Sequence, residues 1–158
     1  MPHRPGMRPL EEQVREALDA GITMLQLREK YLSEEDFLRE ALSIRKLTER
    51  YHVPLIINDS LYVAINSGAD GIHIGQSDLP AREVRAKLGP DKLIGVSAHT
   101  VEEALRAQAA GADYLGVGAA FVTGTKADAS PISRETIRAI TAAVNIPVVA
   151  IGGISHDN

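Results

Sequence analysis

Polar and charged side chains gather directly after apolar, strand-like segments of this sequence. The first group is Gln26, Arg28 and Lys30, at the end of the segment 22–27. Because side chains alternate along a strand, we expect these three to share one face. Two cations and an amide on one face favour an anion with several oxygens, since Arg offers a forked pair of donors and Lys a point charge. The alternative is a solvated strand end.

Two carboxylates follow the next two strand-like segments. Asn58 and Asp59 come directly after 55–57, and Asp78 follows 71–74 in the run Gly-Gln-Ser-Asp. Carboxylates on adjacent loops can share a hard cation such as Mg²⁺, with substrate phosphates completing its shell. The alternative is that Asp59 and Asp78 are N-caps of the helices that follow them.

Two histidines and two glycine-containing segments are further candidates for site residues. His73 lies between isoleucines, which favours a structural interior position, with an acid or base role as the alternative. Ser97 and His99 precede a helical segment, where capping explains them equally well. The run Thr-Gly-Thr-Lys at 123–126 and the pair at 152–153 have the hydroxyls, cation and glycines of a phosphate site.

Composition narrows the class of protein. The chain has 158 residues and a net charge of −4, so a nucleic acid is not an expected partner. Aromatic residues make up 4% of the chain and Cys is absent, which predicts an aliphatic core without disulfides or thiolate metal sites. No apolar run reaches the roughly 18 residues of a membrane span, and no signal peptide is apparent. We expect one soluble, cytoplasmic domain covering 1–158.

Strand-like and helical segments alternate from one end of the chain to the other. Hydrophobic spacing, glycine and proline breaks and Ser or Thr caps set the expected boundaries. Expected helices cover 10–20, 33–50, 61–67, 80–88, 100–110 and 133–144. Expected strands cover 22–27, 55–57, 71–74, 93–96, 114–117 and 147–151. This alternation predicts an α/β protein with a parallel sheet.

One short sequence occurs twice in clear form. Residues 67–72 read Ser-Gly-Ala-Asp-Gly-Ile, and residues 110–115 read Ala-Gly-Ala-Asp-Tyr-Leu. A weaker copy begins at Ala20. Each copy ends a helical segment and begins a strand-like one, which indicates repeated βα units rather than a solenoid.

Two architectures fit this order. A doubly wound sheet concentrates site residues where the strand order reverses, whereas a TIM (β/α)8 barrel displays them at the ends of most strands. Because polar or charged residues follow nearly every expected strand here, we favour the barrel. The chain is shorter than the ~200 residues of a full barrel, so we expect a truncated one that lacks the first and last strands. Its open sheet edges would favour association into a homo-oligomer.

At these residues the sequence resembles the thiamine phosphate synthase family. The similar segments, which cover most of the chain, are 21–30, 53–60, 68–80, 93–100, 111–129 and 146–154. The resemblance implies a TIM barrel. It also implies a transferase that joins hydroxymethylpyrimidine diphosphate to hydroxyethylthiazole phosphate and releases pyrophosphate.

Residue roles follow from the matched motifs. The residues implied to hold the pyrimidine diphosphate are Gln26, Leu27, Arg28, Glu29, Lys30, Asn58, Ser97 and Lys126. Those implied for the thiazole phosphate are Thr123, Gly124, Thr125 and Gly153. Asp59 and Asp78 would bind Mg²⁺. Arg28, Lys30 and Lys126 would act catalytically by stabilising the negative charge that grows on the departing pyrophosphate.

Two other functions stay open. The family's first strand, a Tyr-Leu-Val-Thr-Asp-like stretch, and its eighth strand have no match in this sequence, so an inactive barrel that binds ligand or self-associates is one alternative. The other is a thiazole tautomerase of the same fold, which would depend on His99. The matched diphosphate and metal residues favour the synthase.

Overall fold

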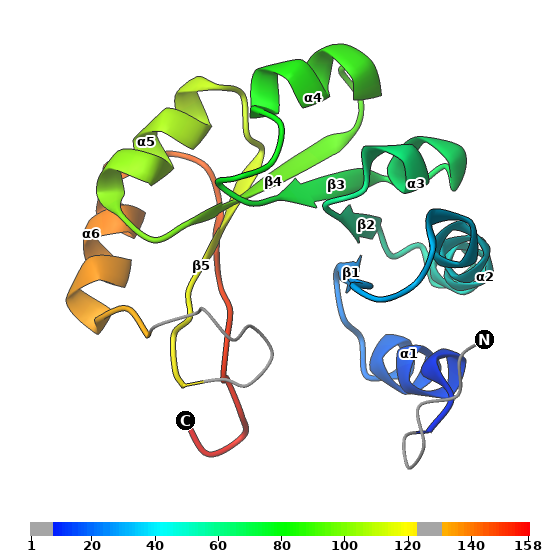
Figure 1. The fold of residues 1–158 in the computed structure, drawn as a ribbon. Coiled ribbons are helices and arrows are strands. Elements are labelled where there is room, and N and C mark those ends of the chain that lie inside the picture. Colours follow the sequence, from blue (N-terminus) through cyan, green and yellow to red (C-terminus); the bar gives the residue numbers. More distant parts are fainter. Residues whose placement is uncertain (1–7, 123–130) are drawn as a thin grey trace. The chain divides into compact units, whose positions relative to one another are not determined.

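The computed structural model describes residues 8–122 and 131–158. In this part of the chain six helices alternate with six strands. The chain divides into two compact units, Met1–His73 and Ile74–Asn158. Figure 1 labels the helices and strands β1 to β5.

The first unit carries a parallel sheet. Its elements are α1 (Leu10–Asp19), β1 (Leu25–Leu27), α2 (Glu34–Tyr51), β2 (Leu55–Asn58), α3 (Leu61–Asn66) and all but the last residue of β3 (Gly71–Ile74). Strand β2 pairs with β1 on one side and with β3 on the other. The register pairs Gln26 with Ile56 and Asn58 with His73. The carboxyl ends of the three strands therefore meet at one edge of the sheet.

Local sequence explains where the helices of this unit begin and end. The side chains of Ser33 and Ser60 accept the backbone N–H groups of Asp36 and Val63, and so cap α2 and α3. Helix α2 ends at Tyr51, and the C-cap residue His52 adopts the left-handed conformation. The aliphatic core includes the fully buried residues Ile44, Leu55, Ile56, Ile57, Val63 and Ile72.

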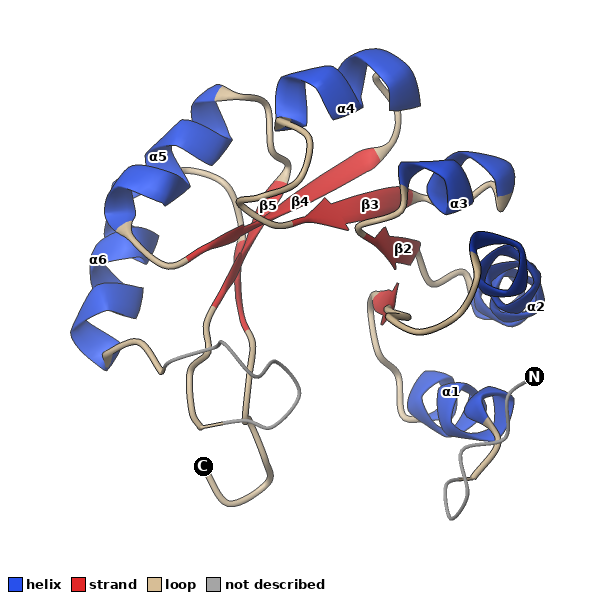
Figure 2. Ribbon diagram, viewed as in Figure 1, coloured by secondary structure: helices blue, strands red, loops and turns tan. Residues whose placement is uncertain are grey.

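The second unit repeats the pattern. Its elements are α4 (Ala81–Leu88), β4 (Leu93–Ala98), α5 (Val101–Ala109), β5 (Tyr114–Val117), α6 (Arg134–Ala143) and β6 (Val148–Ala150). Strand β5 pairs in parallel with β4 and with β6. Figure 2 shows α4, α5 and α6 on the same side of β4 and β5. The largest fully buried core residues are Val84, Ile94, Leu115, Val117 and Ile140.

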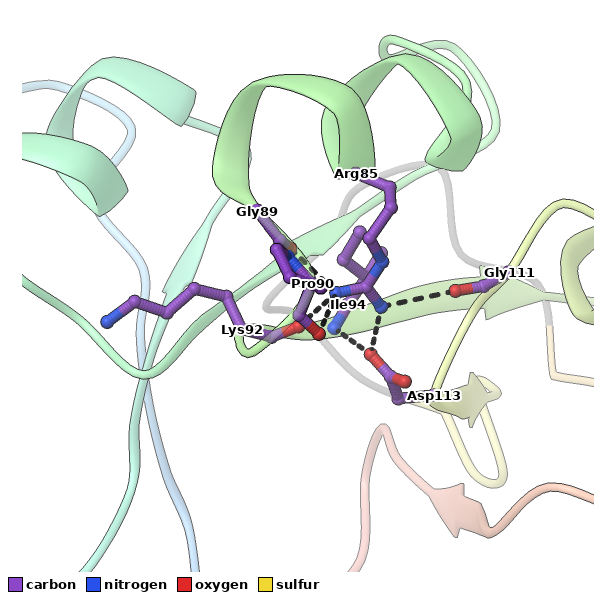
Figure 3. Close-up of polar contacts among 7 residues, drawn as sticks. All are labelled: Arg85, Gly89, Pro90, Lys92, Ile94, Gly111 and Asp113. Atoms are coloured by element: carbon purple, nitrogen blue, oxygen red, sulfur yellow. Dashed lines mark hydrogen bonds and ion pairs between the residues drawn. The ribbon is translucent and has the colours of Figure 1, made fainter.

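Arg85 ties helix α4 to the amino-terminal ends of β4 and β5 (Figure 3). Its guanidinium donates to the carboxylate of Asp113 at 2.5 Å and to the carbonyl oxygens of Gly89 at 3.2 Å and Gly111 at 3.3 Å. The same carboxylate oxygen of Asp113 accepts the backbone N–H of Ile94 at 2.7 Å. One ion pair therefore joins a helix and two strands.

The first unit contains the same arrangement. Asp70 pairs with Arg45 of α2 and accepts the backbone N–H of Leu55 at 2.8 Å. Asp70 and Asp113 are the aspartates of the two Gly-Ala-Asp copies in the sequence. The repeat is therefore structural: in each copy the aspartate links the start of one strand to the start of the preceding strand and to a helix.

The predicted elements and the parallel pairing are confirmed in the described residues, with shifted ends. Strand β1 begins at Leu25 rather than at Ile22, and β4 extends to Ala98, so Ser97 lies inside a strand. Helix α6 begins one residue later than expected, after Ser133, which is its N-cap. Within 8–122 and 131–158, no helix combines the length and the apolar character that crossing a membrane requires.

Candidate functional site

The ends of β1 and β2 carry the first part of the predicted site. Gln26 lies in β1, and Arg28 follows the last residue of that strand. The Nε atom of Arg28 is buried and has no hydrogen-bond partner within the described residues. Because a buried polar nitrogen is normally satisfied, this donor fits an anionic ligand that supplies the missing acceptor.

The predicted common face of Gln26, Arg28 and Lys30 is not enforced by a strand. Strand β1 ends at Leu27, so the alternation of side chains stops before Lys30, which lies in the following bend. Lys30 is exposed, Glu29 is half-buried and Leu27 belongs to the core. The expectation of one continuous strand face is therefore wrong beyond Leu27, because the strand ends there, as predicted, and Arg28 and Lys30 lie after it.

Asp59 follows β2 in a left-handed backbone conformation, with φ of 65°. Its backbone N–H donates to the carbonyl oxygen of His73 at 2.9 Å, and the residue is exposed. The N-cap of α3 is Ser60 and not Asp59, so the capping explanation of Asp59 is wrong. Left-handed non-glycine residues have a conformational cost and are concentrated at functional sites, which favours a chemical role for this carboxylate.

Asn58 and His73 are neighbours in the sheet of the first unit. They are paired in register between β2 and β3, and both are buried. Paired residues of parallel strands direct their side chains to the same face of a sheet. The predicted interior position of His73 is confirmed, and an acid or base role for it stays a prediction.

In the second unit, Asp78 lies in the loop that precedes α4. Its carboxylate accepts the backbone N–H of Gly75 at 2.6 Å. Helix α4 has Pro80 at its N-cap, without a side-chain hydrogen bond. Asp78 is therefore not the cap that the alternative explanation expected. It closes the Gly75–Asp78 turn with one carboxylate oxygen.

The segment around Ser97 also differs from the capping explanation. Ser97 is buried within β4, and its carbonyl oxygen accepts the Gln76 side-chain amide at 2.6 Å. Thr100 is the N-cap of α5, and the backbone N–H of His99 donates to the Glu103 carboxylate at 2.7 Å. Neither Ser97 nor His99 is thus the cap, although His99 takes part in the hydrogen bonding at the helix start.

The remaining predicted residues follow β5 and β6 in the sequence. Thr123, Gly124, Thr125 and Lys126 lie outside the described residues. Gly153 follows β6 with φ of 64°, and a Cβ atom there would lie 2.5 Å from the carbonyl oxygen of Val122. Gly153 therefore packs closely against the protein's own backbone. Sequence reasoning missed this contact, since no local pattern marks it.

A cavity of about 350 Å³ lies within the second unit, between the start of α4 and helix α5. Its residues come from the loop after β3, from β4 and from both helices. They are Ile74, Gly75, Gln76, Asp78, Leu79, Pro80, Ala81, Val96, Glu103, Arg106, Ala107 and Ala110. The cavity borders the Asp78 turn.

A magnesium ion is compatible with the carboxylates present. Among residues 8–122 and 131–158 there is no cluster of three or more acidic or histidine side chains that could hold a metal by itself. In phosphate-handling sites, Mg²⁺ is typically bound by one or two carboxylates, water and substrate phosphates. The exposed carboxylates of Asp59 and Asp78 fit that mode of binding.

The fold and these strand-end residues define the class of protein: a parallel α/β protein whose strand ends fit anionic ligands. A family model for thiamine monophosphate synthase matches residues 2–158. The thiamine-phosphate synthase of Ruminiclostridium cellulolyticum is 54% identical over 149 residues, covering 94% of this chain and 71% of the relative. That of Clostridium acetobutylicum is 52% identical over 151 residues, covering 96% and 72%. The chain belongs to the thiamine monophosphate synthase family.

A solved structure supports the same assignment. The thiamine phosphate pyrophosphorylase from Pyrococcus furiosus superposes with a TM-score of 0.87 at 40% identity, covering 96% of this chain and 72% of that chain. The family resemblance stated from the motifs is therefore confirmed. Family membership makes the chain a transferase of thiamine biosynthesis and favours the synthase over the tautomerase.

Proposed function

We propose that this chain joins hydroxymethylpyrimidine diphosphate to hydroxyethylthiazole phosphate, giving thiamine phosphate and pyrophosphate. The observation that carries the proposal is the family match over residues 2–158. The positions of Arg28, Asn58 and Asp59 at the strand ends support it. They provide a cationic hydrogen-bond donor for an anion, an amide and a carboxylate at one edge of the first unit's sheet.

The pyrimidine diphosphate is proposed to bind through the residues that follow β1 and β2, together with Ser97 and Lys126. Arg28 suits the diphosphate because its buried Nε lacks a partner within the described part of the chain. Its planar fork can bond two oxygens at once, and Lys30 adds a mobile charge. Thr123, Thr125 and Gly153 are proposed to bind the thiazole phosphate.

Asp59 and Asp78 are proposed to hold Mg²⁺. When bound, the ion would neutralise charge on the diphosphate oxygens. The backbone is left-handed at Asp59, and a hydrogen bond to the Asp78 carboxylate closes the turn at that residue. These features fix the course of the chain where the two carboxylates lie. Each residue is exposed, so each can complete the coordination of an ion that the substrate brings with it.

The proposed reaction is dissociative. The bond between the pyrimidine methylene carbon and the diphosphate oxygen breaks, and its electron pair leaves with the pyrophosphate. Arg28, Lys30 and Lys126 stabilise the negative charge that grows on this leaving group. The thiazole nitrogen then donates its lone pair to the methylene cation. No side chain is needed as a nucleophile.

The architecture proposed for this chemistry is a TIM (β/α)8 barrel, supported by the TM-score of 0.87 to the Pyrococcus furiosus enzyme. Such barrels carry their active sites at the carboxyl ends of the strands, where the residues above lie in sequence. The expected lack of the first and last strands, the cytoplasmic location and the homo-oligomer stay predictions.

A coupling assay tests the proposed function. The purified chain, both substrates and Mg²⁺ should give thiamine phosphate and pyrophosphate in equal amounts, and omission of either substrate should abolish both products. Arg15→Lys is a control substitution on the exposed face of α1, and it should leave turnover unchanged. Absence of product with intact, folded protein would favour the inactive barrel, and isomerisation of a thiazole carboxylate phosphate would favour the tautomerase.

A further inference from the structure

The cavity of the second unit lies on the helix side of β4. Val96 of that strand lines it, together with residues of α5 and of the start of α4. Side chains alternate along a strand, so Ser97, the next residue, points to the opposite face of β4. Ser97 is one of the residues proposed to bind the pyrimidine diphosphate. Strand β4 therefore stands between this side chain and the cavity, and the proposed reaction gives the cavity no role.

Helix α5 and its C-cap residue form one wall of the cavity. Four residues of this wall are three or four positions apart, and so lie on one side of the helix. They are Glu103, Arg106, Ala107 and Ala110. The two alanines have small side chains, which leave room beside the apolar side chains of Ile74, Leu79 and Val96. The wall is thus charged toward the start of α5 and apolar toward its end.

Glu103 has one carboxylate oxygen in use and one available. Its Oε2 atom accepts the backbone N–H of His99 at 2.7 Å and lies 3.2 Å from Nδ1 of the same residue. Its Oε1 atom has no hydrogen-bond partner among residues 8–122 and 131–158. The side chain is 23% exposed. Because a hydrogen bond is stronger in partly desolvated surroundings, Oε1 is a good acceptor for a charged donor.

Arg106 supplies the opposite charge one helical turn further along. Within the described part of the chain its guanidinium has one ion pair, with the exposed Glu102 at 4.0 Å, which is beyond hydrogen-bond distance. Arg106 and Glu103 are neighbours on the helix surface, yet no ion pair joins them in the described ranges. The cavity wall therefore presents an anion and a cation, each of which can still bind a partner.

We propose that this cavity binds a small α-amino acid with an apolar side chain. The ammonium group donates to Oε1 of Glu103, the carboxylate accepts from the guanidinium of Arg106, and the side chain lies along Ala107 and Ala110. Opposite charges one turn apart favour such a zwitterion over an ion of either sign. The volume of about 350 Å³ is at the lower end of the roughly 300–1,000 Å³ of small-molecule sites.

The ligand class is tested with L-leucine and two truncated probes. Calorimetric titration of the purified chain with L-leucine should show saturable binding to one site. 4-Methylpentanoate lacks the ammonium group and 3-methylbutylamine lacks the carboxylate, so each should bind at least about tenfold more weakly, as for the loss of a charged hydrogen bond. A truncated probe that binds as well as L-leucine would overturn the zwitterion assignment. Absence of saturable L-leucine binding would overturn the site.

Glu103→Gln and Arg106→Gln test the two charges. Each should weaken L-leucine binding about tenfold or more. Glu83→Gln is the matched control for the first variant, because Glu83 is an exposed acidic residue in the first turn of α4 and lies outside the cavity lining. Arg138→Gln, on an exposed position of α6, is the control for the second. Controls that weaken binding as much as the cavity variants would refute the assigned contacts.

A cavity-filling variant locates the ligand. Ala107→Leu places a larger apolar side chain in the space beside α5 and should abolish L-leucine binding. Ala109→Leu, on an exposed position of the same helix, is the control and should bind normally. Thermal melting checks that both variants fold, and if Ala107→Leu does not, the charge variants decide. A folded Ala107→Leu chain that still binds L-leucine would show that the ligand lies elsewhere.

These measurements stay distinct from those on the proposed function, because binding is measured without either substrate. A chain that binds L-leucine and lacks coupling activity would refute the proposed function alone. A chain that couples the two substrates and does not bind L-leucine would refute this inference alone.

Discussion

The backbone N–H of Asp59 donates a 2.9 Å hydrogen bond to the carbonyl oxygen of His73. Asp59 directly follows β2, and His73 lies in β3, so this bond extends the pairing of the two strands by one residue. It supports Asp59 in its left-handed conformation, with φ of 65° and an exposed side chain. The end of the ladder thus sets the backbone geometry of a proposed magnesium ligand.

Asp59→Asn should remove the charge and keep the backbone, because asparagine tolerates the left-handed region. We expect Mg²⁺-dependent coupling to fall about a hundredfold, as for the loss of one electrostatic contact in an active site. The measurement is the initial rate against Mg²⁺ concentration. Asp59→Gly is the control: it relieves the backbone cost, so it should fold at least as well and be similarly inactive. An unchanged Mg²⁺ dependence in either variant would refute the metal role.

Arg28→Lys should weaken binding of the pyrimidine diphosphate, although the charge is retained. Lysine lacks the planar fork and the Nε donor that is buried without a partner among the described residues. We expect its KM for this substrate to rise about tenfold, the effect of about one charged hydrogen bond. Product inhibition by pyrophosphate should weaken in parallel. A variant with an unchanged KM would show that Arg28 does not contact the diphosphate.

Asp113→Ala should destabilise the second unit by about 1–3 kcal/mol, because the N–H of Ile94 loses its acceptor and Arg85 its partner. Partial exposure of both charged side chains favours the lower end of this range. Urea denaturation gives the free energy of unfolding. Arg39→Ala, which removes an exposed ion pair with Asp36, is the control and should have an effect below about 1 kcal/mol. Equal effects of the two variants would argue against the linking role of Asp113.

The pKa of Asp36 should lie below its ordinary value, because its carboxylate accepts a hydrogen bond from Ser33 and pairs with Arg39. A folded-state pKa below the unfolded one contributes stability above the unfolded pKa, near 3.9 for Asp. That contribution is lost as the pH falls through the folded pKa. NMR titration should show Ser33→Ala raising the pKa of Asp36. The pKa of Glu135, which is lowered by its own backbone N–H and by Ser133, is the control and should not move.

Local sequence predicted the helices and strands well because their signals are local. Ser33 and Ser133 are caps whose side chains bond the backbone three residues later. The strand Gly71–Ile74 has the predicted bounds, since an apolar run after a Gly-Ala-Asp turn is a short-range pattern. The motifs were likewise sufficient to recognise the family.

Other features depended on contacts between residues far apart in the chain. Sequence offered Asp59 as a helix cap as readily as a ligand, and the structure excludes the cap, because Ser60 takes that position. Gly118 carried no signal at all, because its constraint comes from Ile151, whose carbonyl oxygen would lie 2.1 Å from a Cβ atom on Gly118. Hydrophobic spacing and capping act over a few residues, so the sequence determined the elements and the chemistry available at their ends. Backbone angles and close approaches at those ends are set by packing, so only the tertiary structure decided them.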